Sequence, residues 1–93
     1  MANWIYTVDL KPIWEKYEDL SHEDFDNDPD IFVEMKDEMV NAIKKQLRPG
    51  DHKEVVNVLT GLRNAKHLSS FNTLWNRLYD FCDYKKIWLK TSF

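Results

Sequence analysis

With 93 residues, the chain is long enough for one small domain, residues 1–93, with a limited hydrophobic core. Aromatic residues make up 14% of it, and the presence of only two glycines and three prolines argues against a disordered or loop-rich protein. The net charge of −3 conceals an uneven distribution of acidic and basic residues along the chain.

Three features predict a soluble cytoplasmic protein. The first six residues lack the basic and apolar regions of a signal peptide. No apolar run approaches the ~20 residues that a membrane span requires. The single cysteine, Cys82, can form no internal disulfide. Its position among apolar residues at helical spacing predicts a buried thiol rather than a nucleophile.

The first predicted element is a strand. From Asn3 to Leu10, the large side chains of Trp4, Tyr6 and Val8 recur at every second position, and aromatic and β-branched residues predominate. This strand requires a partner, because an isolated strand leaves its backbone polar groups unpaired.

Two short helices are predicted next. Pro12 suits the first residue of a helix of about two turns, since the N–H that proline lacks would be unpaired there. Ser21 and Asp24 have the spacing of a capping box, with aspartate in place of glutamate, and predict a short turn of helix over residues 22–25.

The middle of the chain contains two longer predicted helices. Asp28 followed by proline resembles an N-cap and predicts the longest helix, over about residues 29–47. Asp51 and Glu54 resemble another start signal, for a helix to about Lys66. The segment 54–61 is also compatible with a buried strand, but its caps and length favour a helix.

The clearest pattern lies at the end of the chain. From Ser70, apolar residues recur at the spacing of one helix face, and after Asp83 and Tyr84 the period changes to two. In this final strand Ile87, Leu89, Thr91 and Phe93 alternate with Lys86, Trp88, Lys90 and Ser92. We expect a mostly helical α+β fold of four to five helices, with the N- and C-terminal strands paired in a small antiparallel sheet.

Charge divides the chain into an acidic third and a basic remainder. Between Glu15 and Glu38, eleven acidic residues face only Lys16 and Lys36, whereas ten basic and four acidic residues follow from Met39 onward. Such asymmetry indicates a binding face, or two segments that partly neutralise each other.

No catalytic or metal-binding pattern is present, so we expect no enzyme and no cofactor. The acidic run from Asp24 to Asp30 fails as an EF-hand, because the sixth position is Pro29 or Ile31 where glycine is needed. The three histidines lack metal-ligand spacing, and the two isolated glycines form no phosphate-binding loop.

Trp88 allows two interpretations. It shares a strand face with Lys86 and Lys90, so an exposed Trp88 could stack on a nucleic-acid base or anchor a protein partner. Alternatively, it packs on the N-terminal strand, near Trp4 or Tyr6.

Two resemblances bear on function. Asn72–Leu78 resembles the N-x-x-LW-x-x-L helix of barstar-type ribonuclease inhibitors, but without that family's preceding tyrosines and glycine, so neither fold nor site residues are transferred. The opening strand, the acidic middle and the segment Phe71–Thr91 together resemble small accessory proteins encoded by phages and prophages, a class that includes anti-CRISPR and other anti-defence proteins. That resemblance implies an inhibitor of a host protein.

The leading hypothesis is a small protein-binding module whose acidic face occupies a basic, nucleic-acid-binding surface of a larger protein. The residues expected to contact this partner are Glu23, Asp24, Asp26, Asp30, Glu34, Asp37 and Trp88. The alternative is a nucleic-acid-binding accessory or regulatory protein that uses the basic remainder of the chain with Trp88 as a stacking residue. Its contact residues would be Arg48, Lys53, Arg63, Lys66, Lys85, Lys86 and Lys90.

Overall fold

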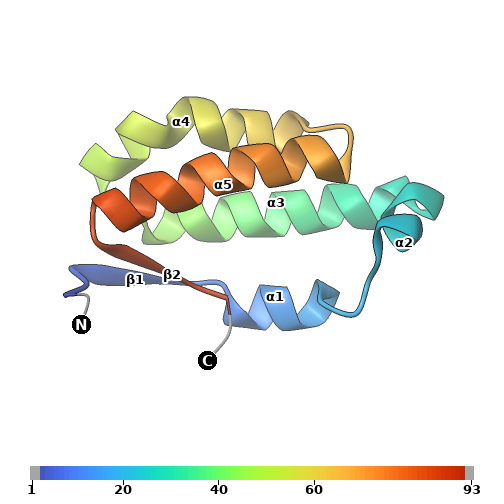
Figure 1. Ribbon diagram of the computed structural model, residues 1–93, viewed down its shortest axis with the longest axis horizontal. Coiled ribbons are helices and arrows are strands. Elements are labelled where there is room, and N and C mark those ends of the chain that lie inside the picture. The colour runs from blue at the N-terminus through green and yellow to red at the C-terminus, as the bar shows by residue number, and fades with distance from the viewer. Residues whose placement is uncertain (1–2, 92–93) are drawn as a thin grey trace.

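The computed structural model describes residues 3–91, and within them it confirms a mostly helical chain with one two-stranded sheet. The elements in chain order are β1 (Tyr6–Asp9), α1 (Lys11–Tyr17), α2 (His22–Asn27), α3 (Pro29–Gln46), α4 (Pro49–Asn64), α5 (Leu68–Tyr84) and β2 (Ile87–Lys90) (Figure 1).

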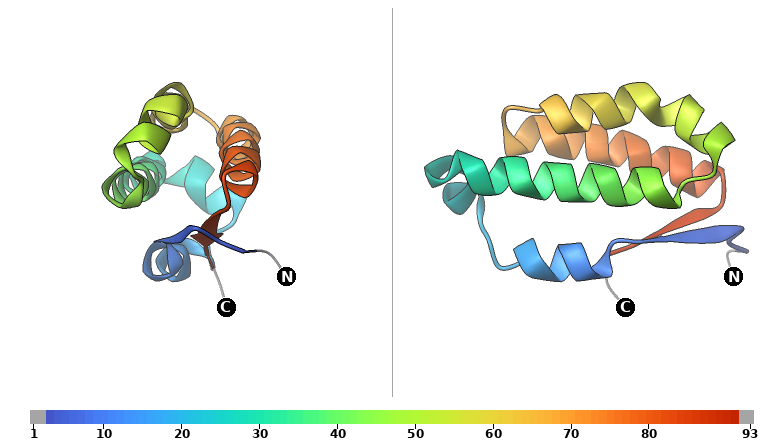
Figure 2. Two further views of the ribbon diagram at one scale, coloured as in Figure 1. Left: turned by 90° about the vertical axis from the view of Figure 1, so that its left-hand side faces the viewer. Right: turned by 180° about the vertical axis from the view of Figure 1, so that it is seen from behind.

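Five elements form a closed ring around the core. The strand β1 packs on α3, α3 on α4, α4 on α5, and α5 on β2, which pairs with β1. Seen along the long axis, the three long helices and the sheet surround a common centre (Figure 2). The short helices α1 and α2 lie outside this ring, and both pack mainly on α3.

The predicted antiparallel pairing is wrong, because β1 and β2 run parallel, with Tyr6 beside Ile87 and Asp9 beside Lys90. The reason lies in the number of chain reversals. Helices α1 and α2 continue the direction of β1, after which α3, α4, α5 and β2 each reverse it (Figure 1). Four reversals return the chain to its original direction, so the terminal strands must be parallel.

The core is apolar and receives side chains from every element of the ring. Its fully enclosed residues include Val8, Ile43, Leu59, Leu78 and Ile87, none of them more than 1% exposed. Burying such side chains supplies most of the favourable free energy of folding in a domain of this size. The predicted helix face from Phe71 to Cys82 and the inward positions of the last strand are thereby confirmed, while Phe93 lies outside the described residues.

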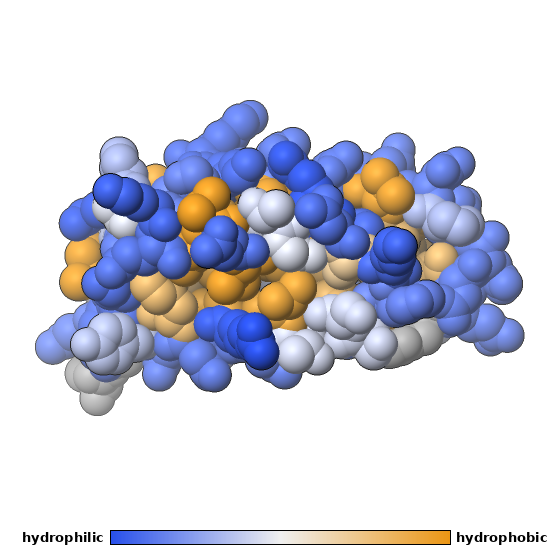
Figure 3. All heavy atoms as spheres, turned by 90° about the horizontal axis from the view of Figure 1, so that it is seen from above, coloured by the Kyte–Doolittle hydropathy of each residue, from blue (hydrophilic) through white to orange (hydrophobic). Residues whose placement is uncertain are grey.

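Helices α4 and α5 approach closely at Gly61. A Cβ atom placed on this glycine would lie 3.0 Å from Leu74 Cδ1, so the Leu74 side chain would have to shift to accommodate a larger residue. Seen from above, hydrophobic patches lie along the middle of this face, with hydrophilic side chains among them and on both margins (Figure 3).

The predicted N-terminal caps of α2 and α3 are confirmed. Ser21 and Asp24 form a reciprocal capping box at α2, and Asp28 caps α3 by accepting a hydrogen bond from the Ile31 N–H. The predicted start of α4 at Asp51 is wrong, since the helix begins at Pro49 without a side-chain cap.

Instead of capping α4, Asp51 holds β1 in place. The Tyr6 hydroxyl donates to Asp51 Oδ2 at 2.6 Å, and the Arg48 guanidinium lies 4.7 Å from the Tyr6 ring centre. At the other end of the strand, the Gln46 side chain accepts from the Asp9 N–H at 2.7 Å and donates to the Asp9 carbonyl at 2.9 Å. Residues at the end of α3 and the start of α4 thus hold both ends of β1.

Replacing Leu78 by alanine should lower the free energy of unfolding by roughly 2–5 kcal/mol, because Leu78 is fully buried and the change leaves a cavity. Chemical denaturation measures this loss. Tyr84→Ala is the control, because Tyr84 is 80% exposed and its loss should cost under about 0.5 kcal/mol. Similar losses for both variants would contradict the described core.

Replacing Lys86 by glycine should raise the stability by up to about 1 kcal/mol, because Lys86 has a φ of 61°, which costs a residue with a side chain roughly 1–2 kcal/mol. Lys85→Gly is the matched control, since Lys85 has a φ of −84° and its replacement should destabilise the protein. Equal effects of the two changes on the denaturation midpoint would contradict this account of the turn.

Candidate functional site

The predicted acidic contact residues gather mainly at one end of the long axis, on α2 and the first half of α3 (Figure 1). Glu23, Asp26, Asp30 and Glu34 are all exposed there. Within residues 3–91, none of these four carboxylates takes part in an ion pair. We call these four residues the acidic end.

Two other predicted contact residues have structural partners. The Asp24 carboxylate accepts from the Ser21 N–H at 2.9 Å, so this predicted contact residue is also part of the capping box of α2. Asp37 lies 3.4 Å from Arg63 Nε and joins α3 to α4. The structure therefore leaves four of the six predicted acids available for contacts.

Trp88 lies on β2, away from α2 and the acidic end (Figure 1). Its ring stacks on Trp4, with ring centres 6.5 Å apart, and each residue is 38% exposed. The expectation that Trp88 packs beside Trp4 is confirmed. The Lys90 ammonium lies 5.8 Å from the Trp88 ring centre, within the range of a cation–π contact.

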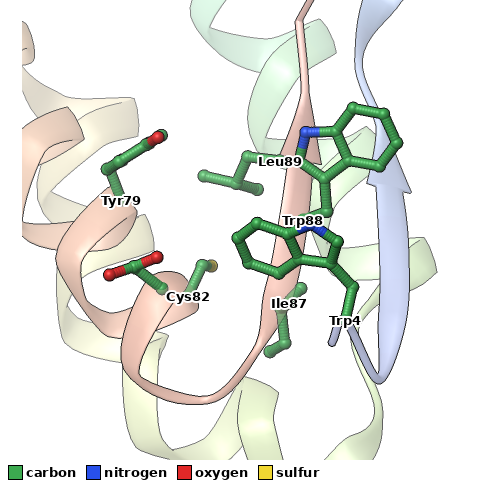
Figure 4. A pocket seen from close by; sticks show the side chains of 7 residues that line it. Trp4, Tyr79, Cys82, Ile87, Trp88 and Leu89 are labelled. Atoms are coloured by element: carbon green, nitrogen blue, oxygen red, sulfur yellow. The ribbon is translucent and has the colours of Figure 1, made fainter. Parts of the chain in front are cut away.

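The space beside Trp88 is too small for a ligand. Tyr79 on α5 faces Trp4 and Trp88 across a gap, with Cys82 and Ile87 on its inner side (Figure 4). The slot between them has a volume of about 10 Å³. Since one water molecule requires roughly 10–15 Å³, the slot cannot hold a base or another small molecule in this conformation.

Two of the predicted basic contact residues, Arg63 and Lys85, already have internal partners. Lys85 pairs with Glu54 at 3.0 Å, and Arg63 donates to Asn41 Oδ1 at 2.6 Å in addition to its contact with Asp37. The positive charge of the basic remainder is therefore partly neutralised inside the molecule.

Lys36 is a buried cation that the sequence pattern did not distinguish from a surface lysine. It is 6% exposed, and its ammonium donates to the carbonyl of Ala65 at the C-terminal end of α4. The Phe32 ring centre lies 4.4 Å from the same ammonium. Burial lowers the pKa of Lys36, and the charge of the nearby Asp37 carboxylate opposes this effect in part. The role of Lys36 is to attach α4 to α3.

An apolar cleft that sequence reasoning missed lies next to the acidic end. One wall comes from α1, α2 and their connection, the floor from α3, and the opposite wall from the start of α5. Its volume is about 180 Å³, and among the described residues Glu18 is the only charged one in its lining. The apolar spacing in α1 was the only sequence signal for one wall of the cleft. It could not indicate the opposite wall, because α5 is more than 40 residues away in sequence.

Four contacts between aromatic rings border this cleft and connect all the elements that form it. The ring centres lie 6.1 Å apart from Trp14 to Trp75, 6.0 Å from Trp75 to Phe71, 6.2 Å from Phe71 to Phe32 and 5.7 Å from Phe32 to Phe25. Aromatic contacts of this kind add specific geometry to hydrophobic burial, and here they link the walls of the cleft to one another.

A hydrogen-bonded ion pair fixes α1 behind the cleft. Glu38 on α3 accepts from the Tyr17 hydroxyl at 2.5 Å and from the Lys16 ammonium at 2.9 Å. The hydrogen bond from Tyr17, and after it that from Lys16, lowers the pKa of Glu38 below its ordinary value of 4.5.

Cys82 is buried, as predicted, and desolvation raises the pKa of its thiol to about 12, which keeps it protonated at neutral pH. Among the side chains that the structure describes, which do not include that of His22, no group of three histidine, cysteine or acidic residues is arranged to hold a metal ion. None of the helices in that range has both the length and the hydropathy of a membrane span.

Comparison with protein-family models, with curated proteins and with solved structures finds no match for this chain. The resemblance to phage-encoded accessory proteins therefore stays a prediction.

Replacing Glu38 by glutamine should lower the stability at pH 7 by about 1 kcal/mol or less, because the Glu38 side chain is 40% exposed. Since the folded pKa of Glu38 is below 4.5, the charged carboxylate stabilises the protein above that pH and loses this effect as pH falls through the folded pKa. The difference between wild type and variant should therefore shrink on acidification.

Urea denaturation at several pH values measures this difference. Glu34→Gln is the matched control, because Glu34 is exposed on the same helix without an ion pair in the described part of the chain. A difference between wild type and Glu38→Gln that stays constant from pH 7 to below pH 4 would contradict the role given to Glu38.

Proposed function

We propose that this protein is a non-enzymatic binding module whose acidic end contacts a basic surface of a larger protein. The observation that carries the proposal is the set of four exposed carboxylates, Glu23, Asp26, Asp30 and Glu34, which lack ion pairs in the described part of the chain. Their charges remain available to a partner, whereas Asp37 and Glu38 are already paired with cations of this molecule.

Clustered carboxylates have two effects on a basic partner. They accelerate the encounter by long-range attraction, and they compete with phosphate groups for the same lysine and arginine side chains. A nucleic-acid-binding surface of a larger protein would be subject to both effects. The resemblance to phage accessory proteins adds only that this larger protein would be a host protein. The protein would then act as an inhibitor that occupies that surface.

The second candidate function is nucleic-acid binding through the basic remainder of the chain. It is favoured by Trp88, which is 38% exposed with Lys90 beside its ring. It is disfavoured by the internal partners of Arg63 and Lys85, and by the stacking of Trp88 on Trp4. We therefore rank it below binding through the acidic end.

An affinity pull-down from a bacterial lysate, with and without nuclease, tests the choice between the two. Retention of a specific protein after nuclease treatment is expected, because the proposed partner binds the acidic end directly. Recovery of nucleic acid, with loss of bound protein after nuclease, would favour the second candidate.

The variant Glu23→Gln, Asp26→Asn, Asp30→Asn, Glu34→Gln should bind the retained protein more weakly, mainly through slower association, and with a smaller dependence on salt. Its melting temperature should change little, because the helix caps Asp24 and Asp28 are kept. Association rates measured at several salt concentrations test both expectations. The control replaces Lys53, Lys86 and Lys90 by glutamine and should bind almost normally. The opposite pattern would overturn the proposal.

A further inference from the structure

We propose that the cleft beside the acidic end receives one bulky apolar side chain from a basic segment of the partner. This inference rests on the proposed function and adds the chemistry of the contact. The partner segment would combine a phenylalanine, leucine or methionine with flanking lysine or arginine residues. The cleft would hold the apolar side chain, and the acidic end would hold the charges.

The size of the cleft fits a single side chain. Its volume is about 180 Å³, and an apolar protein cavity of about 150 Å³ is known to hold one benzene ring. A whole helix or a cofactor would require several times more space. The cleft therefore suits one anchoring side chain of the kind that dominates protein–protein binding energies.

The lining suits an apolar guest of variable shape. Met35 and Met39 form the floor, and both are almost fully buried. Methionine side chains adapt to guests of different outline because they are unbranched and polarisable. The aromatic rings of Trp14, Phe25 and Phe71 stand around this floor and supply flat surfaces for contact.

The charge of the surrounding wall selects a basic segment. Residues 14–25, which supply the wall on the side of α1 and α2, include five acidic residues and one lysine. That lysine, Lys16, pairs with Glu38. The buried ammonium of Lys36 binds the Ala65 carbonyl. The exposed Lys66 lines an adjoining depression that shares Phe25 and Leu68 with the cleft, but Lys66 itself does not line the cleft.

The same charge argues against two other occupants. A second copy of this chain would bring its own acidic wall against the first, and like charges at close range oppose association. An acidic or neutral segment would gain the hydrophobic contact but not the electrostatic one. A basic segment with an apolar anchor satisfies both features of the surface.

Two synthetic peptides test the inference directly. Both are rich in lysine and arginine, and they differ only at a central position that is phenylalanine in one and alanine in the other. The phenylalanine peptide should bind roughly tenfold to a hundredfold more tightly, which is the ratio expected for burying one such side chain. It should also shift the methyl NMR signals of Met35 and Met39, which the alanine peptide should leave almost unchanged.

Asn72→Trp provides a variant that blocks the cleft from its rim. Asn72 is exposed on α5 and belongs to the lining of the cleft, whereas Asn76, one turn later and also exposed, does not. Asn72→Trp should abolish the preference for the phenylalanine peptide, and the matched control Asn76→Trp should retain it. Circular dichroism verifies that both variants are folded. A full preference in Asn72→Trp would overturn the inference.

The outcomes separate this inference from the proposed function. Equal binding of both peptides, weakened by salt and by neutralising the acidic end, would support the proposed function and overturn the cleft inference. A preference for phenylalanine that is insensitive to salt and to those substitutions would support the cleft but overturn the electrostatic proposal. Failure of both peptides to bind at low salt would overturn both.

Discussion

The parallel pairing of β1 with β2 is the constraint on which the rest of the structure depends, because it closes the ring of elements around the core. Each strand brings one fully buried residue of that core, Val8 from β1 and Ile87 from β2. The pairing also sets the position of the cleft. Since α1 begins two residues after β1 ends, any displacement of the strand would carry the wall of the cleft with it. The hydrogen bonds of Tyr6 to Asp51 and of Asp9 to Gln46 therefore support the strand, the core and the cleft together.

Local features of the fold were predictable, whereas strand direction required the whole chain. The caps at Ser21, Asp24 and Asp28 depend on neighbours within three residues, so a short sequence pattern contains all the information needed. The burial of Leu78 and Ile87 follows from periodicity in the same way. The direction of β2 relative to β1 depends on how many connections reverse the chain. The predicted role of Asp51 at the start of α4 was wrong for a related reason. Its partner, Tyr6, is 45 residues away in sequence.

Of the candidate site, too, only the features that depend on individual residues or short segments were predictable. Composition alone indicated an acidic segment, and the structure places Glu23, Asp26, Asp30 and Glu34 on its surface. No local pattern shows that Asp37 faces Arg63, or that Lys36 is buried against the end of α4. The sequence did not predict the cleft either, because its walls come from segments that meet only in the folded chain. Charge is a property of each residue, but pairing and enclosure are properties of the fold.

The cleft and the acidic end adjoin for a physical reason. Helix α1 has only seven residues, so it is too short to cover the seam between α3 and α5 along its whole length. The chain then crosses to α2, which packs on α3 but leaves the apolar side chains near Phe71 partly uncovered. The segment that makes this crossing is rich in acidic residues, as exposed connections in a small protein tend to be polar. An opening in the apolar layer thus lies beside unpaired carboxylates. A partner that covered both would bury the apolar surface that the protein's own short helix leaves exposed.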